Sequence, residues 1–471
     1  MNPSKIVMKK ILQIHLCLFL LLINAINVKA QNDTLKVMTY NVLNYGDACQ
    51  GPNSTMRNYL KNIISYTQPD ILGLVKMNTL KRFPSDFNGN LPVDFCDSMV
   101  QYVLNPAGNI SYNYCQYTNE ARGSDMNVLF YNKDKLVNIY TKVLTVNITD
   151  FDLYKFYYKD PNLSTSHDTT YLYVVLFHTQ SGSDPTIRNT QLTSTYNAIK
   201  GRFSSLPNMI VMGDFNLRNS SEVCYNQLVN STDTSFKFND PPFSIDGTFS
   251  YPSNWQGSSM FSACFTTSTR IDLIHPNSCG TDGGAKDWYD HILFSPWMVN
   301  GKNYMSYVPH SYKTIGNDGK RFGISANDST VNGKNNSAPT DIINSIFHLS
   351  NKYPVLTKIA VRSNTTGISP ADPENVNTGI AELTFDENAI SVTNPTGNIL
   401  NIRINENFIE MRMTILITDI TGKEFLKAKL IDGSYLHSID ISSLPKGFYF
   451  LNFLIEGEHF SFSKKIIKTE Q

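Results

Sequence analysis

Short apolar runs that end in polar turn residues recur along the chain. One run, Met209 to Met212, is followed by a glycine and then by Asp214, Phe215 and Asn216. Apolar runs bounded by turn residues are typical of buried strands. If extended geometry continues past the glycine, Asp214 and Asn216 point to the same side at the end of this strand. A carboxylate and a carboxamide placed this way can hold a hard cation or a phosphate-bound water, although the same residues also form ordinary turns.

The rest of this part of the chain predicts strands mixed with helices. A helix is expected at 188–200, and the Gly-, Asn-, Asp-, Ser- and Lys-rich stretch 315–340 predicts a long surface loop. Further strands are predicted at 35–45, 66–75, 127–135, 171–178 and 287–295, and the segment 347–357 closes the domain. The strand at 171–178 places His178 at its end, and the strand at 287–295 carries Asp290 near its start.

A second pattern begins after a stretch rich in Pro, Gly, Ser and Asn, which predicts a linker at 361–382. Short alternating strands follow at 390–395, 400–404, 413–422 and 448–453, with turn residues between them. This pattern predicts a small all-β sandwich over 383–471.

Composition narrows the class of protein. The chain has 471 residues, enough for one large core and a smaller module. Lys+Arg and Asp+Glu number 40 each, so there is no global charge to favour a nucleic-acid coat or a polybasic membrane binder. Only 17% of residues are charged, while 25 Tyr and 27 Phe are many, which favours an extracytoplasmic, β-rich protein.

The first 30 residues predict a secretory signal peptide. Three lysines precede the apolar run 11–23, and Val28 and Ala30 are the small residues expected before cleavage at Gln31. The run is shorter than the roughly 20 residues that span a membrane, and Cys17 lacks the small residues that normally precede a lipidated cysteine. No later stretch is long and apolar enough to be a transmembrane anchor.

Six cysteines follow the predicted signal peptide, and their pairing cannot be deduced from sequence. The pairs Cys96–Cys115 and Cys264–Cys279 are favoured only because each closes a short loop. The spacing of Cys and His does not match a zinc site.

Six short motifs occur in one order between about residues 35 and 360: Tyr40-Asn41, Pro69-Asp-Ile-Leu-Gly-Leu74, His178 with Ser181-Gly182, Gly213-Asp-Phe-Asn216, Asp290-x-Ile-Leu-x-Ser295 and Tyr353-Pro-Val355. Together they resemble the endonuclease/exonuclease/phosphatase superfamily, which includes pancreatic-type deoxyribonucleases, abasic-site endonucleases and sphingomyelinases. Segments 286–295 and 312–323 are most similar to secreted members from Bacteroidetes-type bacteria. The resemblance covers residues 31–360 as one domain.

This resemblance implies a four-layer α/β (α+β) sandwich, in which two packed mixed β-sheets are flanked by helices. It also implies an active site where strand ends converge. In that family a glutamate chiefly holds a divalent metal, usually Mg²⁺, and a late histidine paired with an aspartate acts as general acid or base. The reaction requires these residue types, because hard cations prefer carboxylates and phosphodiester hydrolysis needs charge neutralisation and proton transfer.

Residue by residue, the resemblance carries over in part. Asn41 matches the first-strand asparagine, and His178 matches the phosphate-binding histidine. Asp214 and Asn216 match the Asp-x-Asn pair that positions water and phosphate, and Asp290 matches the aspartate of the late strand. The resemblance thus implies Asp214, Asn216 and His178 as catalytic residues, with Asp214 and Asp290 as metal ligands.

Two positions depart from the family pattern. The metal-binding glutamate of the second strand is replaced by Lys76, and the catalytic Asp-His pair is replaced by Asn351 and Lys352. A lysine in place of glutamate changes the site by two charge units, and one pair of unit charges about 4 Å apart is worth roughly 4 kcal/mol at an effective dielectric near 20. Loss of the histidine removes proton transfer worth on the order of 10²–10⁴-fold in rate.

Three hypotheses follow. In the first, the domain is a pseudoenzyme in which Lys76 and Lys352, with Asn41, His178 and Asn216, bind a phosphorylated, nucleic-acid or sugar-like ligand without a metal. In the second, it is an active phosphodiesterase or nuclease that needs Mg²⁺ or Mn²⁺. Its metal site is then rebuilt from a new carboxylate set: Asp214, Asp290 and either Asp47 or Asp70. In the third, it is a surface structural or adhesive protein whose inherited site has no ligand.

The C-terminal module carries a second resemblance. Asn394-Pro395, Asp419-Ile-Thr-Gly-Lys423, Leu444-Pro-Lys-Gly-Phe-Tyr449 and Lys464-Lys465 resemble the C-terminal sorting domain of the type IX secretion system. The resemblance covers about residues 383–471. It implies the type IX machinery as a partner, with export across the outer membrane and then release or attachment at the cell surface.

Overall fold

The computed structural model describes residues 32–47, 49, 51–78, 92–251, 254–273, 279–364, 368–374, 390–404, 413–430, 436–455 and 461–469. The predicted signal peptide lies outside the described residues. Within them, no helix has the length and apolar character needed to cross a membrane.

The first sheet has the strand order β10-β12-β1-β2-β4-β3, with β11 paired to β12. β1 and β2 are parallel and the remaining pairs are antiparallel. The C-terminal ends of β1 and β2, which carry Asn41 and Lys76, therefore lie at one edge of the sheet. The strands are β1 (Asn32–Tyr45), β2 (Ile71–Asn78), β3 (Tyr112–Tyr114), β4 (Asp125–Asn132), β10 (Met305–Tyr307), β11 (Lys313–Thr314) and β12 (Val355–Arg362).

The second sheet has the strand order β5-β6-β7-β8-β9, and only β7 and β8 are parallel. Its strands are β5 (Leu136–Val146), β6 (Asp150–Tyr158), β7 (Tyr171–His178), β8 (Met209–Asp214) and β9 (Asp290–Phe294). The register sets His178 opposite Asp214 and Asp214 opposite Asp290. Three of the candidate residues thus form a row across three adjacent strands.

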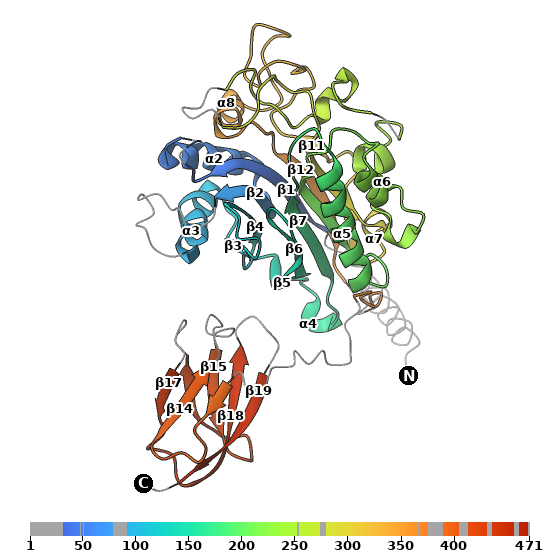
Figure 1. Ribbon diagram of the computed structural model, residues 1–471. Coiled ribbons are helices and arrows are strands. Elements are labelled where there is room, and N and C mark those ends of the chain that lie inside the picture. Colours follow the sequence, from blue (N-terminus) through green and yellow to red (C-terminus); the bar gives the residue numbers. More distant parts are fainter. Residues whose placement is uncertain are drawn as a thin grey trace, which may run out of the picture.

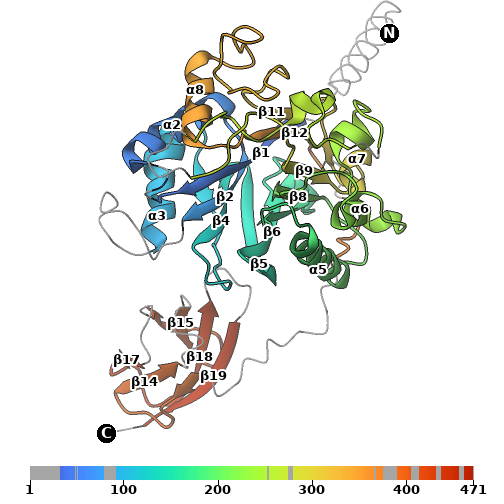
Figure 2. The same cartoon turned by 45° about the horizontal axis from the view of Figure 1, so that its top comes forward.

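The two sheets pack face to face, and helices cover their outer faces (Figures 1 and 2). Alternate strand residues divide between two clusters: Val37, Val174 and Ile210 pack between the sheets, whereas Met38 and Val175 face the outer layers. The helices are α2 (Asn53–Thr67), α3 (Pro92–Met99) and α8 (Thr340–Leu349) on the side of the first sheet, and α5 (Thr186–Arg202) and α6 (Val223–Val229) on that of the second, with short α4 (Leu163–Ser166) and α7 (Pro296–Asn300). The predicted four-layer sandwich is confirmed.

The C-terminal module is a small all-β unit, as predicted. One sheet has the order β13-β14-β17 and the other β16-β15-β18-β19. Alternating apolar residues from both sheets, such as Ile402, Ile417 and Leu451, form one buried cluster. The strands are β13 (Ile390–Val392), β14 (Ile399–Ile404), β15 (Met413–Thr418), β16 (Glu424–Lys429), β17 (Leu436–Asp440), β18 (Gly447–Ile455) and β19 (Ser461–Lys468).

The two cysteine pairs favoured by loop length are wrong. All six cysteines after residue 31 are free thiols in the structure. Cys96 lies in the outer cluster and Cys115 between the sheets, so the first sheet separates them. Cys264 is buried in the outer cluster, whereas Cys279 is partly exposed and contacts a different cysteine.

The segment predicted as a linker begins as a packed part of the first domain. The Glu374 carboxylate lies 2.6 Å from Lys155 Nζ and 2.7 Å from Arg202 Nη2, and it accepts hydrogen bonds from the hydroxyls of Tyr140 and Tyr173. Burial opposes ionisation, but the hydrogen bonds from Lys155 and Tyr140 lower the pKa of Glu374 to about 2. This buried network holds residues 368–374 on the second sheet.

Replacing Glu374 with alanine should destabilise the domain by about 3 kcal/mol, because it leaves Lys155 and Arg202 without their main counter-charge. Urea unfolding of the natural and variant chains measures this difference. Because the folded pKa of Glu374 is depressed, its contribution is present above a pH of about 4.5 and is lost as the pH falls toward 2. Glu374→Gln, which keeps the shape of the side chain, should lose this acid dependence; an unchanged acid profile would contradict the assignment.

Candidate functional site

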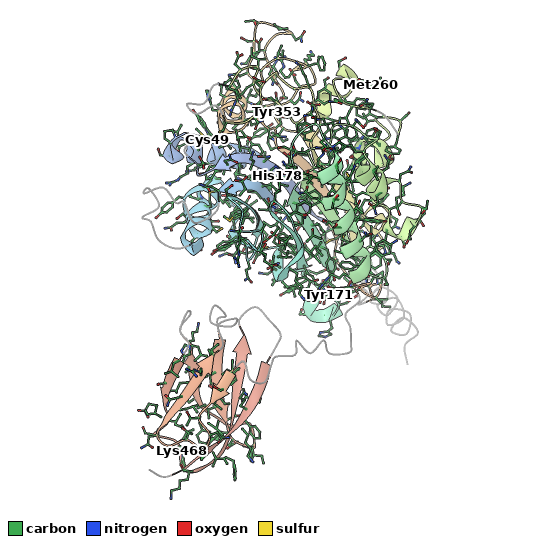
Figure 3. All side chains as sticks on the ribbon, in the orientation of Figure 1. Cys49, Tyr171, His178, Met260, Tyr353 and Lys468 are labelled. Carbon is green, nitrogen blue, oxygen red and sulfur yellow. The ribbon has the colours of Figure 1, made fainter. Side chains whose placement is uncertain are left out.

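The candidate residues gather where the C-terminal ends of the parallel strands of both sheets meet. His178, Asp214 and Asp290 come from the second sheet, and Asn41 comes from the first. The Asn41 Nδ2 atom donates to Asp214 Oδ2 at 2.8 Å, which joins the two sheets. Figure 3 shows His178 inside the domain and Tyr171, at the other end of β7, at the opposite edge.

Asp214 is the centre of this group. It is fully buried, and its Oδ2 atom lies 3.0 Å from Lys352 Nζ in addition to accepting from Asn41. Its Oδ1 atom accepts from the backbone N–H of Asn216 at 2.9 Å. Burial alone disfavours the carboxylate, but the charge of Lys352 and these hydrogen bonds lower the pKa of Asp214 below its usual value. Asp214 is therefore ionised, and its charge is already balanced by Lys352.

The strand ends at Asp214, so extended geometry does not reach Asn216, contrary to the sequence expectation. Asn216 has a φ of 47°, and the hydrogen bond from its N–H to Asp214 closes a turn that such residues favour. Its Nδ2 atom donates to the Thr179 carbonyl at 2.9 Å, so its amide fixes the chain after His178. Gly213 has a φ of 140°, and a Cβ there would lie 1.9 Å from the Phe177 carbonyl oxygen.

Lys352 is held in place by the segment 350–353. The Ser350 hydroxyl donates to the Asn41 carbonyl at 2.7 Å and accepts from the Lys352 N–H at 3.1 Å. The Lys352 ammonium also lies 4.2 Å from the centroid of the Tyr289 ring, a cation–π contact. The Asn351 side chain makes a different contact, since its Nδ2 atom donates to Thr281 Oγ1 at 2.6 Å.

Asp290 lies opposite Asp214 in the pairing of β8 with β9. It is fully buried, and within the described part of the chain neither carboxyl oxygen has a hydrogen-bond partner. Burial and the neighbouring charge of Asp214 raise the pKa of Asp290 well above its usual value. Ionisation of Asp290 is therefore disfavoured, because a second buried anion beside Asp214 is unfavourable.

Lys76 lies on the same side of the domain as the other candidates. It lies between Val75 and Met77, where the parallel pairing of β2 with β1 shifts register; it has a φ of 61° and is partly exposed. Its positive charge acts on Asp125 and on His178. Of the described carboxylates, none lies within 4 Å of its ammonium. Lys76 is thus a reachable cation, unlike Lys352, which is 5% exposed.

His178 is buried and uncharged. Its Nδ1 atom has no hydrogen-bond partner among the residues that the structure describes. Burial lowers the pKa of His178 to about 4, and the positive charges of Lys76 and Lys352 act in the same direction. The negative charge of Asp214 opposes this shift. At neutral pH the imidazole can donate or accept a hydrogen bond but carries no positive charge.

The structure separates the two carboxylates proposed for a rebuilt metal site. Asp70 precedes β2 at the opposite edge of the first sheet, where it accepts from Asn132 Nδ2 at 2.7 Å and from the Lys36 N–H at 2.9 Å. Asp70 therefore cannot join Asp214. Asp47 follows β1 on the candidate side, and its Oδ1 atom accepts from the Cys49 N–H at 3.0 Å. Over the described ranges, no three His, Cys, Asp or Glu side chains gather in a way that could hold a metal.

Sequence reasoning missed Tyr289, whose ring covers Lys352, and Ser350, which positions it. Tyr289 directly precedes Asp290, but nothing in that spacing shows which way its ring points. Ser350 directly precedes Asn351 and Lys352, and this position next to the replaced Asp-His pair was the available signal.

A cavity of about 310 Å³ lies away from these residues, at the other end of β7. Its lining includes Tyr171, Trp297, Asn303 and Asp372. Its polar groups are already engaged in part, since Asp372 pairs with Lys155 at 3.0 Å. The geometry of the strand ends, and not the size of this cavity, therefore defines the candidate site.

Comparison with known protein families finds a match for the C-terminal module. Residues 394–469 match the family described as the secretion system C-terminal sorting domain, which confirms the prediction for the tail and indicates export by type IX secretion to the cell surface or the extracellular space. No curated protein sequence matches the chain.

Among solved structures, similar ones include an endonuclease/exonuclease/phosphatase family protein from Bacteroides thetaiotaomicron, with a TM-score of 0.40, 13% identity and coverage of 71% of this chain and 97% of that one. A mannosyl-6-phosphatase from the same organism has a TM-score of 0.39 and 12% identity, covering 69% of this chain and 99% of that one. The human Nocturnin catalytic domain has a TM-score of 0.39 and 15% identity, with coverage of 70% of this chain and 98% of that one.

The depressed pKa of His178 gives a prediction. Its imidazole should show no titration in NMR spectra between pH values of about 5.5 and 8, because an ordinary histidine titrates near 6.5. Because the folded pKa lies below the unfolded one, this group contributes stability above a pH of about 6.5 that is lost as the pH falls toward 4. Lys76→Gln should raise the pKa of His178 by removing a nearby positive charge.

Lys133→Gln is the matched control, since Lys133 is exposed and follows β4 at the opposite edge of the first sheet. It should leave the His178 signal unchanged. A midpoint near 6.5 in the natural chain would contradict the burial and charge environment described above.

Proposed function

We propose that the chain is an exported protein whose endonuclease/exonuclease/phosphatase-like domain does not hydrolyse phosphoesters and binds a phosphorylated ligand beside Lys76. The observation that carries this proposal is the 3.0 Å ion pair between Lys352 Nζ and Asp214 Oδ2. It places an ammonium of the protein on the carboxylate that the resemblance assigns to catalysis.

The donor set does not fit Mg²⁺ or Mn²⁺. A divalent ion at Asp214 has to displace Lys352, and burial and the charge of Asp214 disfavour ionisation of the second nearby carboxyl, Asp290. Lys76 adds a positive charge where the resemblance implies a metal-binding glutamate. Repulsion between unit charges about 4 Å apart is worth roughly 4 kcal/mol at an effective dielectric near 20, and a divalent ion doubles it.

Proton transfer lacks a suitable group as well. Lys352 stands where the resemblance implies the late histidine. Its ammonium is paired with Asp214 and contacts the Tyr289 ring. His178 is the remaining imidazole, but its pKa of about 4 makes it a weak base. A group that titrates well below the working pH transfers protons inefficiently.

Ligand binding rests on the groups that remain available. Lys76 is a partly exposed cation, and His178 has an Nδ1 atom without a partner in the described structure. Asn41, Lys352 and the Asn216 amide are used internally, so the proposed ligand contacts are fewer than the sequence predicted. Phosphate oxygens suit an ammonium and an imidazole N–H as donors.

Catalysis is tested by a triple reversion. The natural chain from residue 31 and the variant Lys76→Glu/Asn351→Asp/Lys352→His are compared for Mg²⁺- and Mn²⁺-dependent hydrolysis of DNA and of a generic phosphodiester. We expect background rates for the natural chain and at least about 10²-fold faster hydrolysis for the revertant, the lower range for a restored general base. Adding Asp214→Asn to the revertant should abolish the gain.

Metal-dependent hydrolysis by the natural chain at the revertant's rate would instead support a rebuilt active site. Its carboxylates then have to be found among groups other than Asp70, which lies at the opposite edge.

Ligand binding is tested with inorganic phosphate, followed through the His178 NMR signal at constant ionic strength. Lys76→Gln should weaken phosphate binding about tenfold, because a charge-assisted hydrogen bond is worth roughly 1.5–3 kcal/mol. Lys133→Gln should have no effect. If phosphate shifts no signal at the candidate site, the alternative of a surface structural or adhesive protein is favoured.

A further inference from the structure

Two of the six cysteines differ from the others in exposure and in position. Cys49 and Cys279 are partly exposed, whereas Cys96, Cys115, Cys224 and Cys264 are buried. The side chains of Cys49 and Cys279 lie close enough to interact with each other. They come from loops more than 200 residues apart in the sequence, so only the fold brings them together.

Local packing fixes this contact from both sides. Cys49 follows β1; its N–H donates to Asp47 Oδ1 at 3.0 Å, and its Sγ atom accepts from Asn44 Nδ2 at 3.7 Å. Cys279 precedes Gly280, where an added Cβ would lie 3.2 Å from the Leu43 side chain. The backbone next to Cys279 is therefore packed directly against the end of β1.

A further hydrogen bond holds the second loop. Asn351 Nδ2 donates to Thr281 Oγ1 at 2.6 Å, two residues after Cys279. The Cys279 loop thus lies between the end of β1 and the segment that positions Lys352. Both anchors are independent of the sulfur atoms, so the fold itself, and not a bond between the cysteines, brings the two loops together.

No other cysteine pair has this geometry. Cys96, Cys224 and Cys264 are buried in the outer hydrophobic cluster, and Cys115 is buried between the sheets. Burial shields these four thiols from an oxidant.

We propose that Cys49 and Cys279 form a disulfide bond in the exported protein. The match of residues 394–469 to a sorting domain places the chain on an export route, where disulfides persist. The oxidant is a reactive protein disulfide of that route. One cysteine thiolate attacks it to give a mixed disulfide, and the second thiolate then displaces the carrier. The two thiols lose two protons and two electrons, and the carrier disulfide is reduced to a dithiol.

The bond joins two loops that border the candidate site. The positive charge of Lys76 acts on Cys279, and Asn351 is hydrogen-bonded to the same loop. A covalent link here fixes the surroundings of Lys76. The inference is independent of ligand binding, because it depends only on the two sulfur atoms and on export.

The test uses the chain from residue 31, purified from an oxidising compartment. Peptide mapping without reductant should find Cys49 linked to Cys279, and alkylation of the unfolded protein should label four thiols before reduction and six after it. Reduction should lower the Tm by on the order of 5 °C, because the bond closes a very long loop. Six free thiols before reduction, or a different linked pair, would overturn the proposal.

Cys279→Ser separates this bond from other effects of the reductant. In this variant the reductant-dependent shift of Tm should vanish, and Cys49 should become alkylated. Cys224→Ser, at a buried thiol outside the pair, is the matched control and should keep the reductant-dependent shift. Persistence of the shift in Cys279→Ser would show that the stabilising bond lies elsewhere.

Discussion

The buried carboxylate of Asp214 is the interaction on which the candidate site depends. It receives Asn41 from the first sheet, Lys352 from the segment after α8, and the Asn216 N–H from its own turn. A buried charge is costly unless it is paired and hydrogen-bonded. These three partners satisfy Asp214 and, in doing so, tie the strand ends of both sheets together. The states of its neighbours are linked to this charge, because burial and Asp214 disfavour ionisation of Asp290, whereas His178 is kept uncharged chiefly by burial.

Retention of Asp214 therefore has a structural explanation that does not require catalysis. Removing one partner of a buried ion pair typically costs about 3–5 kcal/mol, since the other charge is left uncompensated. Once Lys352 occupies this position, replacing either residue alone is unfavourable. The pair thus contributes to the stability of the fold whether or not a reaction is performed. A motif such as Gly213-Asp-Phe-Asn216 can therefore be present without catalysis. This is why charge balance within the site informs function more than the presence of the motif does.

The sequence predicts the layers well and the contacts poorly. β7 matches the predicted strand 171–178, and α5 extends the predicted helix 188–200 by two residues at each end, because apolar runs and helical periodicity reflect local burial. The left-handed conformation of Asn216 was not predicted, since it depends on a turn closed by Asp214. The pairing of Lys352 with Asp214 and the contact of Cys49 with Cys279 join residues distant in sequence, and only the folded topology reveals them.

The place where the chain leaves the first domain bears on how the site is presented. Asp372 and Glu374 are bound by Tyr173 near the start of β7, whereas His178 ends the same strand at the opposite edge. The covalent connection toward the sorting domain therefore leaves from the edge away from the candidate site. An exported domain held through this connection keeps its strand-end edge, with Lys76, free of the attachment point. That arrangement suits a protein that presents a binding site outside the cell, and it places no demand on catalytic groups.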